Sequence, residues 1–175
     1  FDCMIGSTAG QRMALSQAVH HCSLRSVFGA RLVEQPLMRN VLADLALESE
    51  AATVLAMRLA HAVDAGEDDL VRLAVALGKF WVCKRTAPMV AEALECHGGN
   101  GYVEENGLAR LYREAPLNSI WEGSGNVNAL DVVRAVTREP ATLEALAREL
   151  DRVRGRSAEL DRHVDAALAQ ARSLD

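Results

Sequence analysis

Apolar residues recur at spacings of three and four over most of this chain, most clearly between Pro36 and Gly66. The apolar positions of that segment include Leu42, Leu45, Ala52, Leu55, Leu59 and Val63. Such spacing gathers them on one face of an α-helix. Pro36 suits a first turn, where its missing N–H costs nothing. At 1.5 Å per residue, about 30 residues form a rod of roughly 45 Å, which is typical of a long-helix bundle.

The same periodicity predicts one long helix before this segment in the sequence and another after it. The first is predicted from about Asp2 to Val27 and ends at Phe28-Gly29, because glycine commonly terminates helices. The other is predicted over Glu67–Cys96. Its acidic first turn suits the helix dipole. Pro88 lies inside this segment, where proline can kink a helix.

Shorter helices are predicted for the remainder of the chain. His97–Gly107 is the least helical stretch, and a short turn of helix is expected at about Leu108–Arg113. Another helix is expected to begin near Ser124 or Asn126, either of which could cap it. An apolar seam then continues over residues 140–168, interrupted only near residue 157. This seam predicts a final amphipathic helix.

The composition favours an all-α fold. Hydrophobic residues make up 50% of the chain, aromatic residues only 4%, and alanine, leucine and valine dominate the hydrophobic set. Alanine and leucine favour helices, whereas strands favour the branched and aromatic residues that are scarce or scattered here. We therefore predict an up-down four-helix bundle of long helices with an additional C-terminal amphipathic helix.

The charge balance and the length of the apolar runs exclude several classes of protein. The 175 residues include 19 Lys and Arg against 24 Asp and Glu, which gives a net charge of −5. This balance excludes a disordered chain and a generally basic nucleic-acid binder. No apolar run reaches the roughly 18 residues that a membrane span needs. We expect a cytoplasmic protein without a membrane segment.

The cysteines and histidines do not predict a metal site. The four cysteines are scattered without a CxxC pair, which favours buried, reduced thiols. His20, His21 and Cys22 are adjacent, but neighbouring residues diverge on a helix, so we interpret them as core or interface residues.

The start at Phe1, with neither an initiator methionine nor a signal-peptide pattern, favours a fragment of a longer protein.

Three glycine-containing clusters depart from regular helix patterns. They are Arg25–Gly29, Glu95–Tyr102 and Trp121–Asn126. Each alone could be a helix cap, a loop or a helix start, because glycine serves any turn with a positive φ. Together, in this order and at these separations, they resemble the C-terminal helical domain of the acyl-CoA dehydrogenase flavoprotein family over about residues 1–138.

Further motifs extend the resemblance. Other family-like positions are Ala43-Asp44, Glu50, Lys79 and Arg110-x-Tyr112-Arg113. Finer detail is similar to the alkylation-response AidB branch: Gln35–Arg39, Cys83–Arg85, Leu111–Glu114 and Ile120–Asn126. The resemblance implies a bundle domain at 1–138, a helical extension at 139–175, and N-terminal domains in the parent protein.

The resemblance implies an oxidoreductase that removes the α and β hydrogens of an acyl-CoA thioester, with FAD as cofactor and a further electron acceptor. Glu122 matches the catalytic carboxylate that takes the α proton. An α-C–H bond is weakly acidic, so such a base must be close and desolvated. The backbone N–H of Glu122 and a flavin hydroxyl would stabilise the enolate. Some members place the base on the first helix, where Met4 stands here, which leaves Glu122 as the candidate.

The same resemblance implies flavin contacts from two subunits. Arg25 and Phe28 match positions that reach the FAD of the adjacent subunit, as a cation for its phosphates and an apolar surface. The loop that approaches the same cofactor through its backbone corresponds to Gly98 and Gly99. The positions that bond the flavin nucleotide of their own subunit correspond to Ser124 and Asn126. A homodimer or a homotetramer is therefore implied.

Three positions depart from the family pattern. Glu95 stands where glutamine is common, and an acid would repel a pyrophosphate, so Glu95 either turns away or holds ribose hydroxyls. A second expected glutamine falls at Pro36, which leaves Gln35 as its stand-in. Trp121 replaces the usual tyrosine before the catalytic acid, and its bulk would alter the acyl pocket.

A second functional hypothesis is a flavin-bearing protein of the AidB type, associated with DNA and alkylation damage, in which dehydrogenation is weak or vestigial. That type is expected to present a basic surface from its C-terminal region. From Arg138 onward, however, seven arginines face eight acids. This balance disfavours DNA binding by the segment and favours a packing or oligomerisation role.

Overall fold

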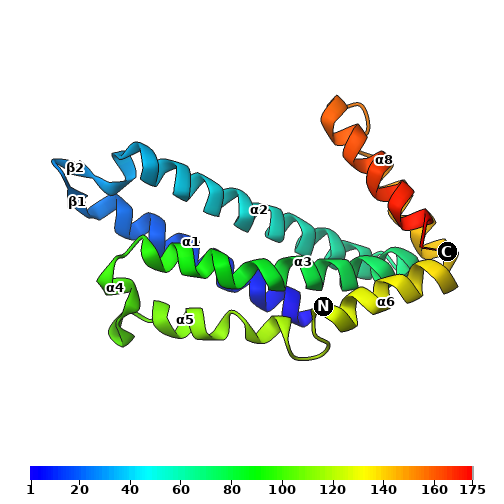
Figure 1. Ribbon diagram of the computed structural model, residues 1–175, viewed down its shortest axis with the longest axis horizontal. Helices are drawn as coiled ribbons and strands as arrows, with labels where there is room; N and C mark the ends of the chain where they lie inside the picture. Colours follow the sequence, from blue (N-terminus) through cyan, green and yellow to red (C-terminus); the bar gives the residue numbers. More distant parts are fainter. Residues whose placement is uncertain (175) are drawn as a thin grey trace.

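Three long antiparallel helices form the body of the molecule. The computed structural model describes residues 1–174, and Figure 1 shows α1 (Asp2–Leu24), α2 (Pro36–Asp64) and α3 (Asp68–Glu95) running side by side in alternating directions. The sequence predicted these three helices to within a few residues. α3 continues through Pro88 as one unbroken helix.

The fourth rod of the bundle consists of several short pieces. They are α4 (Gly99–Tyr102), η2 (Glu104–Asn106), α5 (Leu108–Glu114), η3 (Leu117–Ser119) and α6 (Gly125–Arg138). α5 packs against α1 and α3, and α6 continues along α3, so the chain returns beside the other three helices (Figure 1). This arrangement confirms the predicted all-α, up-down four-helix bundle.

A small hairpin corrects the predicted end of the first helix. α1 stops at Leu24, and β1 (Ser26–Val27) pairs antiparallel with β2 (Ala30–Arg31) before the turn η1 (Leu32–Glu34). The loop residues Phe28 and Gly29 both have positive φ, at 51° and 82°. Two positive φ values match the twist of a two-residue hairpin. The Phe-Gly pair is therefore a hairpin turn, and the predicted helix to Val27 is wrong.

Small side chains bring the helices close together. A Cβ on Gly78 of α3 would lie 2.7 Å from the sulfur of Met4, so α1 and α3 approach closely at this glycine.

All four cysteines are buried and free, as predicted. The buried apolar residues at the hairpin end include Ala14, Ala18, Cys22, Leu42, Leu45, Val90 and Cys96. Those toward the other end include Met4, Ala52, Leu59, Leu70 and Val82.

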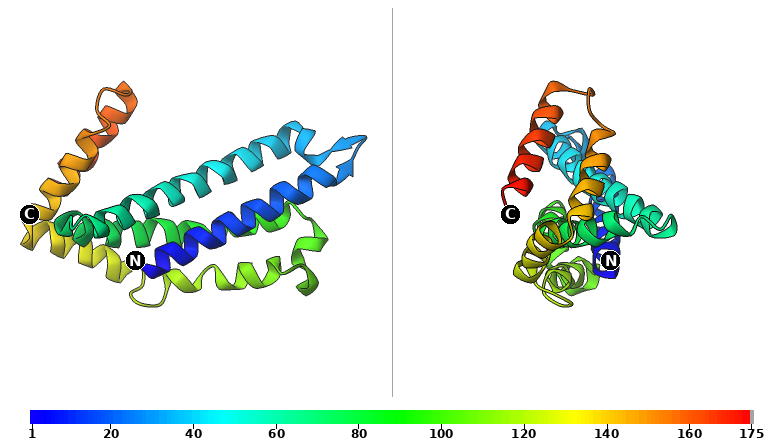
Figure 2. Two further views of the ribbon diagram at one scale, coloured as in Figure 1. Left: turned by 180° about the vertical axis from the view of Figure 1, so that it is seen from behind. Right: turned by 90° about the vertical axis from the view of Figure 1, so that its right-hand side faces the viewer.

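The C-terminal seam forms two helices where the sequence predicted one. α7 (Pro140–Asp151) and α8 (Ala158–Arg172) form a hairpin that leans away from the bundle (Figures 1 and 2). Gly155 has a φ of 79° in the connection, and the Ser157 hydroxyl caps α8 by accepting from the Leu160 N–H at 3.1 Å. These features separate the two helices at the predicted interruption. Among the described residues, no helix is long and apolar enough to cross a membrane.

Candidate active site

Glu122 stands on a loop with an unusual backbone, immediately before α6. Its φ is 52° and that of Gly123 is 104°. A residue other than glycine with such a positive φ costs about 1–3 kcal/mol and persists only where its surroundings hold it in that conformation. The loop therefore requires contacts that hold it in place.

The strongest of these contacts comes from Lys79 on α3. Its ammonium Nζ donates to the carbonyl oxygens of Trp121 at 2.7 Å, Glu122 at 3.1 Å and Gly123 at 2.5 Å. Lys79 is only 5% exposed. A lysine ammonium has three donors, and here all three are used on consecutive carbonyls.

Side-chain amides hold the two ends of the same loop. The Asn128 amide donates to the carbonyls of Gly123 and Ser124 at 2.9 and 3.0 Å. On the other side, the Trp121 ring N–H donates to Asn118 at 2.9 Å, and Asn118 donates to the Ser7 hydroxyl at 3.1 Å. α1, α3 and α6 therefore all contribute to the position of Glu122.

The carboxylate of Glu122 is exposed and has one described side-chain partner. The Cys3 thiol donates to its Oε2 at 3.3 Å. Burial, together with this hydrogen bond, raises the pKa of Cys3, so the thiol stays protonated and acts as a donor. Met4, where the sequence resemblance would place the base of some acyl-CoA dehydrogenases, is fully buried against Gly78. Glu122 therefore presents an exposed carboxylate on this domain, where the sequence led us to expect a desolvated base, and Met4 packs in the core.

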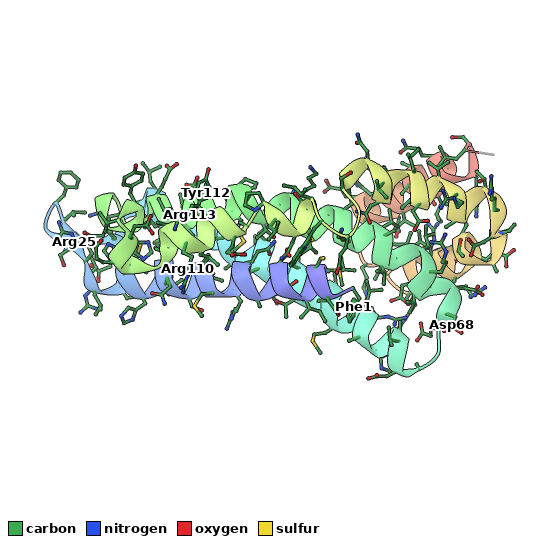
Figure 3. The ribbon with its side chains drawn as sticks, turned by 90° about the horizontal axis from the view of Figure 1, so that it is seen from below. Phe1, Arg25, Asp68, Arg110, Tyr112 and Arg113 are labelled. Carbon is green, nitrogen blue, oxygen red and sulfur yellow. The ribbon has the colours of Figure 1, made fainter. Side chains whose placement is uncertain are left out.

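The predicted cofactor residues of the first cluster lie at the opposite end of the bundle. Arg25 is exposed where α1 meets the hairpin, and Phe28 is 99% exposed at the hairpin tip. The Gln35 side-chain amide donates to the Val27 carbonyl at 3.2 Å, so it braces the hairpin. Figure 3 shows Arg25 at this end, with Arg110, Tyr112 and Arg113 of α5 between it and Phe1.

The second cluster joins the first at this end. Gly98 has a φ of 59°, and a Cβ on Gly98 or Gly99 would meet no atom of the described residues within 4 Å. Their backbone therefore faces open space, as a loop that approaches a cofactor requires. The rings of His21 and His97 stack with centroids 4.6 Å apart, which places this loop beside the end of α1.

Glu95, the last residue of α3, is exposed. It lies on a groove of about 650 Å³ between α3 and α5. Tyr102, Tyr112 and Arg113 line the same groove. The structure therefore places Glu95 beside the glycine loop, on the side that faces α5.

Ser124 and Asn126 lie near Glu122, at the start of α6. Ser124 is the N-cap residue, but its hydroxyl makes no capping hydrogen bond within residues 1–174, and both side chains are exposed. The predicted cofactor residues thus fall into two groups at different ends of the bundle. A helical domain that contributes to two flavin sites would carry its cofactor residues in two places. The exposed side chains and the open glycine backbone are therefore compatible with FAD, the cofactor that the sequence predicted.

Two side chains of the site had no role in the sequence prediction. Lys79 appeared only as a family-like position, and Cys3 only as a buried thiol. The signal for Lys79 was present in the sequence, since a lone lysine interrupts the apolar face of a predicted helix. A buried ammonium requires acceptors, but the sequence does not say which ones.

Comparison with known proteins agrees with this geometry. A family model described as acyl-CoA dehydrogenase, C-terminal domain, matches residues 2–137. The acyl-CoA dehydrogenase homologue AidB of Escherichia coli (strain K12) is 47% identical over 176 residues, which cover 98% of this chain and 32% of that protein.

Two solved structures have the same fold. Caenorhabditis elegans ACDH-11 in complex with C11-CoA superposes with a TM-score of 0.84 at 31% identity, over 96% of this chain and 31% of that one. Butyryl-CoA dehydrogenase from Megasphaera elsdenii gives 0.72 at 27% identity, over 78% and 35%. The chain spans about a third of the length of these relatives. It belongs to the acyl-CoA dehydrogenase family, in which it corresponds to the C-terminal helical domain.

Proposed function

We propose that the full-length protein is an FAD-dependent acyl-CoA dehydrogenase in which Glu122 abstracts the α proton of the acyl thioester. The observation that carries this proposal is the geometry of the Glu122 loop. An exposed carboxylate stands on a backbone that Lys79 and Asn128 hold in a strained conformation. Functional sites are where such strain is commonly retained.

The proposed reaction begins with a proton transfer to Glu122. The carboxylate takes the proton from the α carbon, and the electron pair moves toward the thioester oxygen, where backbone N–H groups stabilise the charge. When bound, FAD would supply the acceptor for the β hydrogen as hydride. Ser124 and Asn126, beside Glu122, would hold the flavin nucleotide of the same subunit.

The residues at the hairpin end would serve a second subunit. Arg25 and Phe28 are exposed there, and Gly98 and Gly99 leave their backbone open. A guanidinium suits phosphate, and open glycine backbone suits close approach. Because this group is separate from Glu122, we propose that the enzyme is a homodimer or homotetramer, with residues 139–175 as a packing extension. The cytoplasm is the proposed location.

The proposal is tested by flavin bleaching in the full-length protein. Purified protein is mixed anaerobically with short and branched acyl-CoAs, and loss of the oxidised flavin absorbance is followed. We expect bleaching by wild type and a decrease of at least about 100-fold in its rate in Glu122→Gln, because general bases contribute about that much. Glu144→Gln, an exposed glutamate on α7, is the matched control. Unchanged bleaching in Glu122→Gln would contradict the proposal.

The DNA-associated alternative makes a different prediction for the same preparation. The C-terminal hairpin neutralises part of its own charge, since Arg152 pairs with Glu149 at 3.0 Å and Arg154 pairs with Asp151 and Asp165 at 2.6 and 2.8 Å. Internal pairing leaves fewer arginines for phosphates. A salt-dependent gel shift on duplex DNA, together with no flavin bleaching, would favour this alternative.

A further inference from the structure

The buried ammonium of Lys79 is the least expected polar group in the bundle. A lysine taken out of water loses hydration, and a methionine of similar shape would fill the same space without that loss. The three hydrogen bonds of Lys79 go to three consecutive carbonyls of one loop, those of Trp121, Glu122 and Gly123. The ammonium therefore restrains the peptide planes of the loop that carries Glu122.

The direction of these carbonyls fixes the direction of the neighbouring N–H groups. In a planar trans peptide, the C=O of one residue and the N–H of the next point in opposite directions. With the three carbonyls directed at Lys79, the N–H groups of Glu122, Gly123 and Ser124 point away from it. Within residues 1–174, these three N–H groups donate to no protein acceptor.

Successive outward N–H groups can bind an anion or a developing negative charge. The Glu122 carboxylate lies on the same loop, so one buried ammonium sets the position of both the base and the donors. The Gly123 carbonyl also accepts from Asn128, which leaves its lone pairs fully used. The loop is therefore clamped from α3 and from α6.

We infer that Lys79 is a positioning residue for the α-proton abstraction: it holds the peptide planes of Trp121–Gly123 so that the carboxylate and the N–H groups of the Glu122 loop face the acyl thioester together. This inference rests on the proposed function. Lys79 is proposed to touch neither substrate nor flavin and to act through the backbone of Glu122. It adds a residue on α3 to a site otherwise formed by the loop before α6.

Two variants of the full-length protein separate positioning from folding. Lys79→Met keeps the shape of the stem and removes every donor, whereas Lys79→Arg keeps a charged donor with a different reach. Arg12→Met, an exposed cation on α1, is the matched control. Flavin absorbance after gel filtration reports whether each variant retains its fold and its cofactor.

The first measurement follows proton abstraction alone. An acyl-CoA analogue with sulfur in place of the β carbon can lose an α proton, but it has no β hydrogen to transfer. Exchange of its α hydrogens with D2O, followed by mass spectrometry, therefore reports on Glu122 without turnover. We expect exchange to slow about 100-fold in Lys79→Met, because a displacement of about 1 Å has that effect on a reacting group. Lys79→Arg should recover part of the rate, and Arg12→Met should match wild type.

The second measurement follows the loop itself. Amide hydrogen exchange of a peptide covering residues 117–128 should be faster in Lys79→Met than in wild type, because without the clamp the hydrogen-bonded amides of Trp121 and Asn128, on either side of the loop, should open more often. A merely structural lysine would change the melting temperature without slowing α-hydrogen exchange in flavin-loaded protein.

The outcomes are distinct. Lys79→Met protein that retains flavin and exchanges α hydrogens at the wild-type rate would overturn the inference. Loss of flavin in both Lys79 variants would assign Lys79 to the fold alone and would overturn it as well. Wild-type protein that exchanges no α hydrogen would contradict the proposed function, and with it the inference that Lys79 positions the base. The loop-amide measurement distinguishes this failure from a failure of the Lys79 inference alone, because it reports on the Lys79 clamp without substrate.

Discussion

At the scale of single residues, the end of the bundle nearest the hairpin carries a titratable pair. His21 on α1 and His97 after α3 stack with an angle of 31° between their rings. The Nδ1 of His97 lies 3.0 Å from the Ala93 carbonyl, which can only accept, so this nitrogen carries the hydrogen. Burial, followed by the nearby charges of His97, Arg25 and His20, lowers the pKa of His21.

This lowered pKa predicts a loss of stability in mild acid. The folded protein binds the proton on His21 less readily than the unfolded chain, so the free energy of unfolding falls as the pH drops below the ordinary value of 6.5. We expect His21→Phe to lose less stability than wild type between about pH 7.5 and 5.5, where histidine titrates. Urea unfolding at the two pH values measures this difference.

His61→Phe, an exposed histidine on α2, provides the comparison and should show the wild-type decrease. Equal pH dependence of wild type and His21→Phe would show that the stacked pair does not determine acid stability.

Residue-scale chemistry was only partly predictable from the sequence. The motif around Glu122 predicted a catalytic carboxylate, but its partners Cys3 and Lys79 lie 119 and 43 positions away along the chain. Contacts between residues so far apart in the sequence depend on how helices cross, and α1 and α3 approach closely where Met4 lies against Gly78. Apolar periodicity predicts which face of a helix is buried, but not which residue it meets.

At the scale of elements, the glycine loop after α3 depends on one close contact. A Cβ added to Gly101 would lie 2.2 Å from the Leu94 carbonyl oxygen, whereas one added to Gly99 would meet no atom within 4 Å in the part of the chain that the structure describes. The Leu94 oxygen belongs to the backbone of α3 and cannot move aside easily. Gly101 therefore allows the loop to fold back tightly onto the end of α3.

We expect Gly101→Ala to destabilise the protein by about 1–3 kcal/mol, the usual range for overpacking a filled site. Gly99→Ala, two residues earlier in the same turn, should leave the free energy of unfolding nearly unchanged. Urea unfolding of the two variants measures the contrast. Equal stability of the two variants would show that the turn does not pack on α3 as described.

The sequence predicted long elements better than short ones. Seams of many apolar residues determine α1, α2 and α3, so their bounds followed to within a few residues. The hairpin at Phe28-Gly29 has only two residues in each strand, too few for an alternating pattern. The break between α7 and α8 depends on the positive φ of Gly155 and the cap at Ser157, which leave only a small interruption in an otherwise regular seam.

At the scale of the whole molecule, the predicted flavin contacts occupy two ends of the bundle. Arg25, Phe28 and the glycine loop lie at the hairpin end, whereas Ser124 and Asn126 lie beside Glu122, near the start of α1 (Figures 1 and 3). One copy of this chain therefore does not bring all of the proposed contacts to one cofactor. This separation is the physical reason for proposing an oligomer.

The separation predicts weak flavin binding by the 175-residue chain alone. Purified chain dialysed after incubation with FAD should retain well below one flavin per chain, because each end offers only part of the proposed contacts. Flavin absorbance relative to protein concentration measures the ratio. Stoichiometric retention by a monomer would contradict the assignment of the two groups to different subunits.

The proposed function depends above all on removal of the α hydrogen of an acyl-CoA by Glu122 in the full-length flavoprotein. The most direct measurement is the rate of flavin bleaching by an acyl-CoA carrying deuterium at its α carbon, in wild type and in Glu122→Gln. We predict slower bleaching of wild type by the deuterated substrate than by the ordinary one, and almost no bleaching of Glu122→Gln by either. Bleaching whose rate does not change with the deuterium and that survives Glu122→Gln would show that Glu122 is not the base.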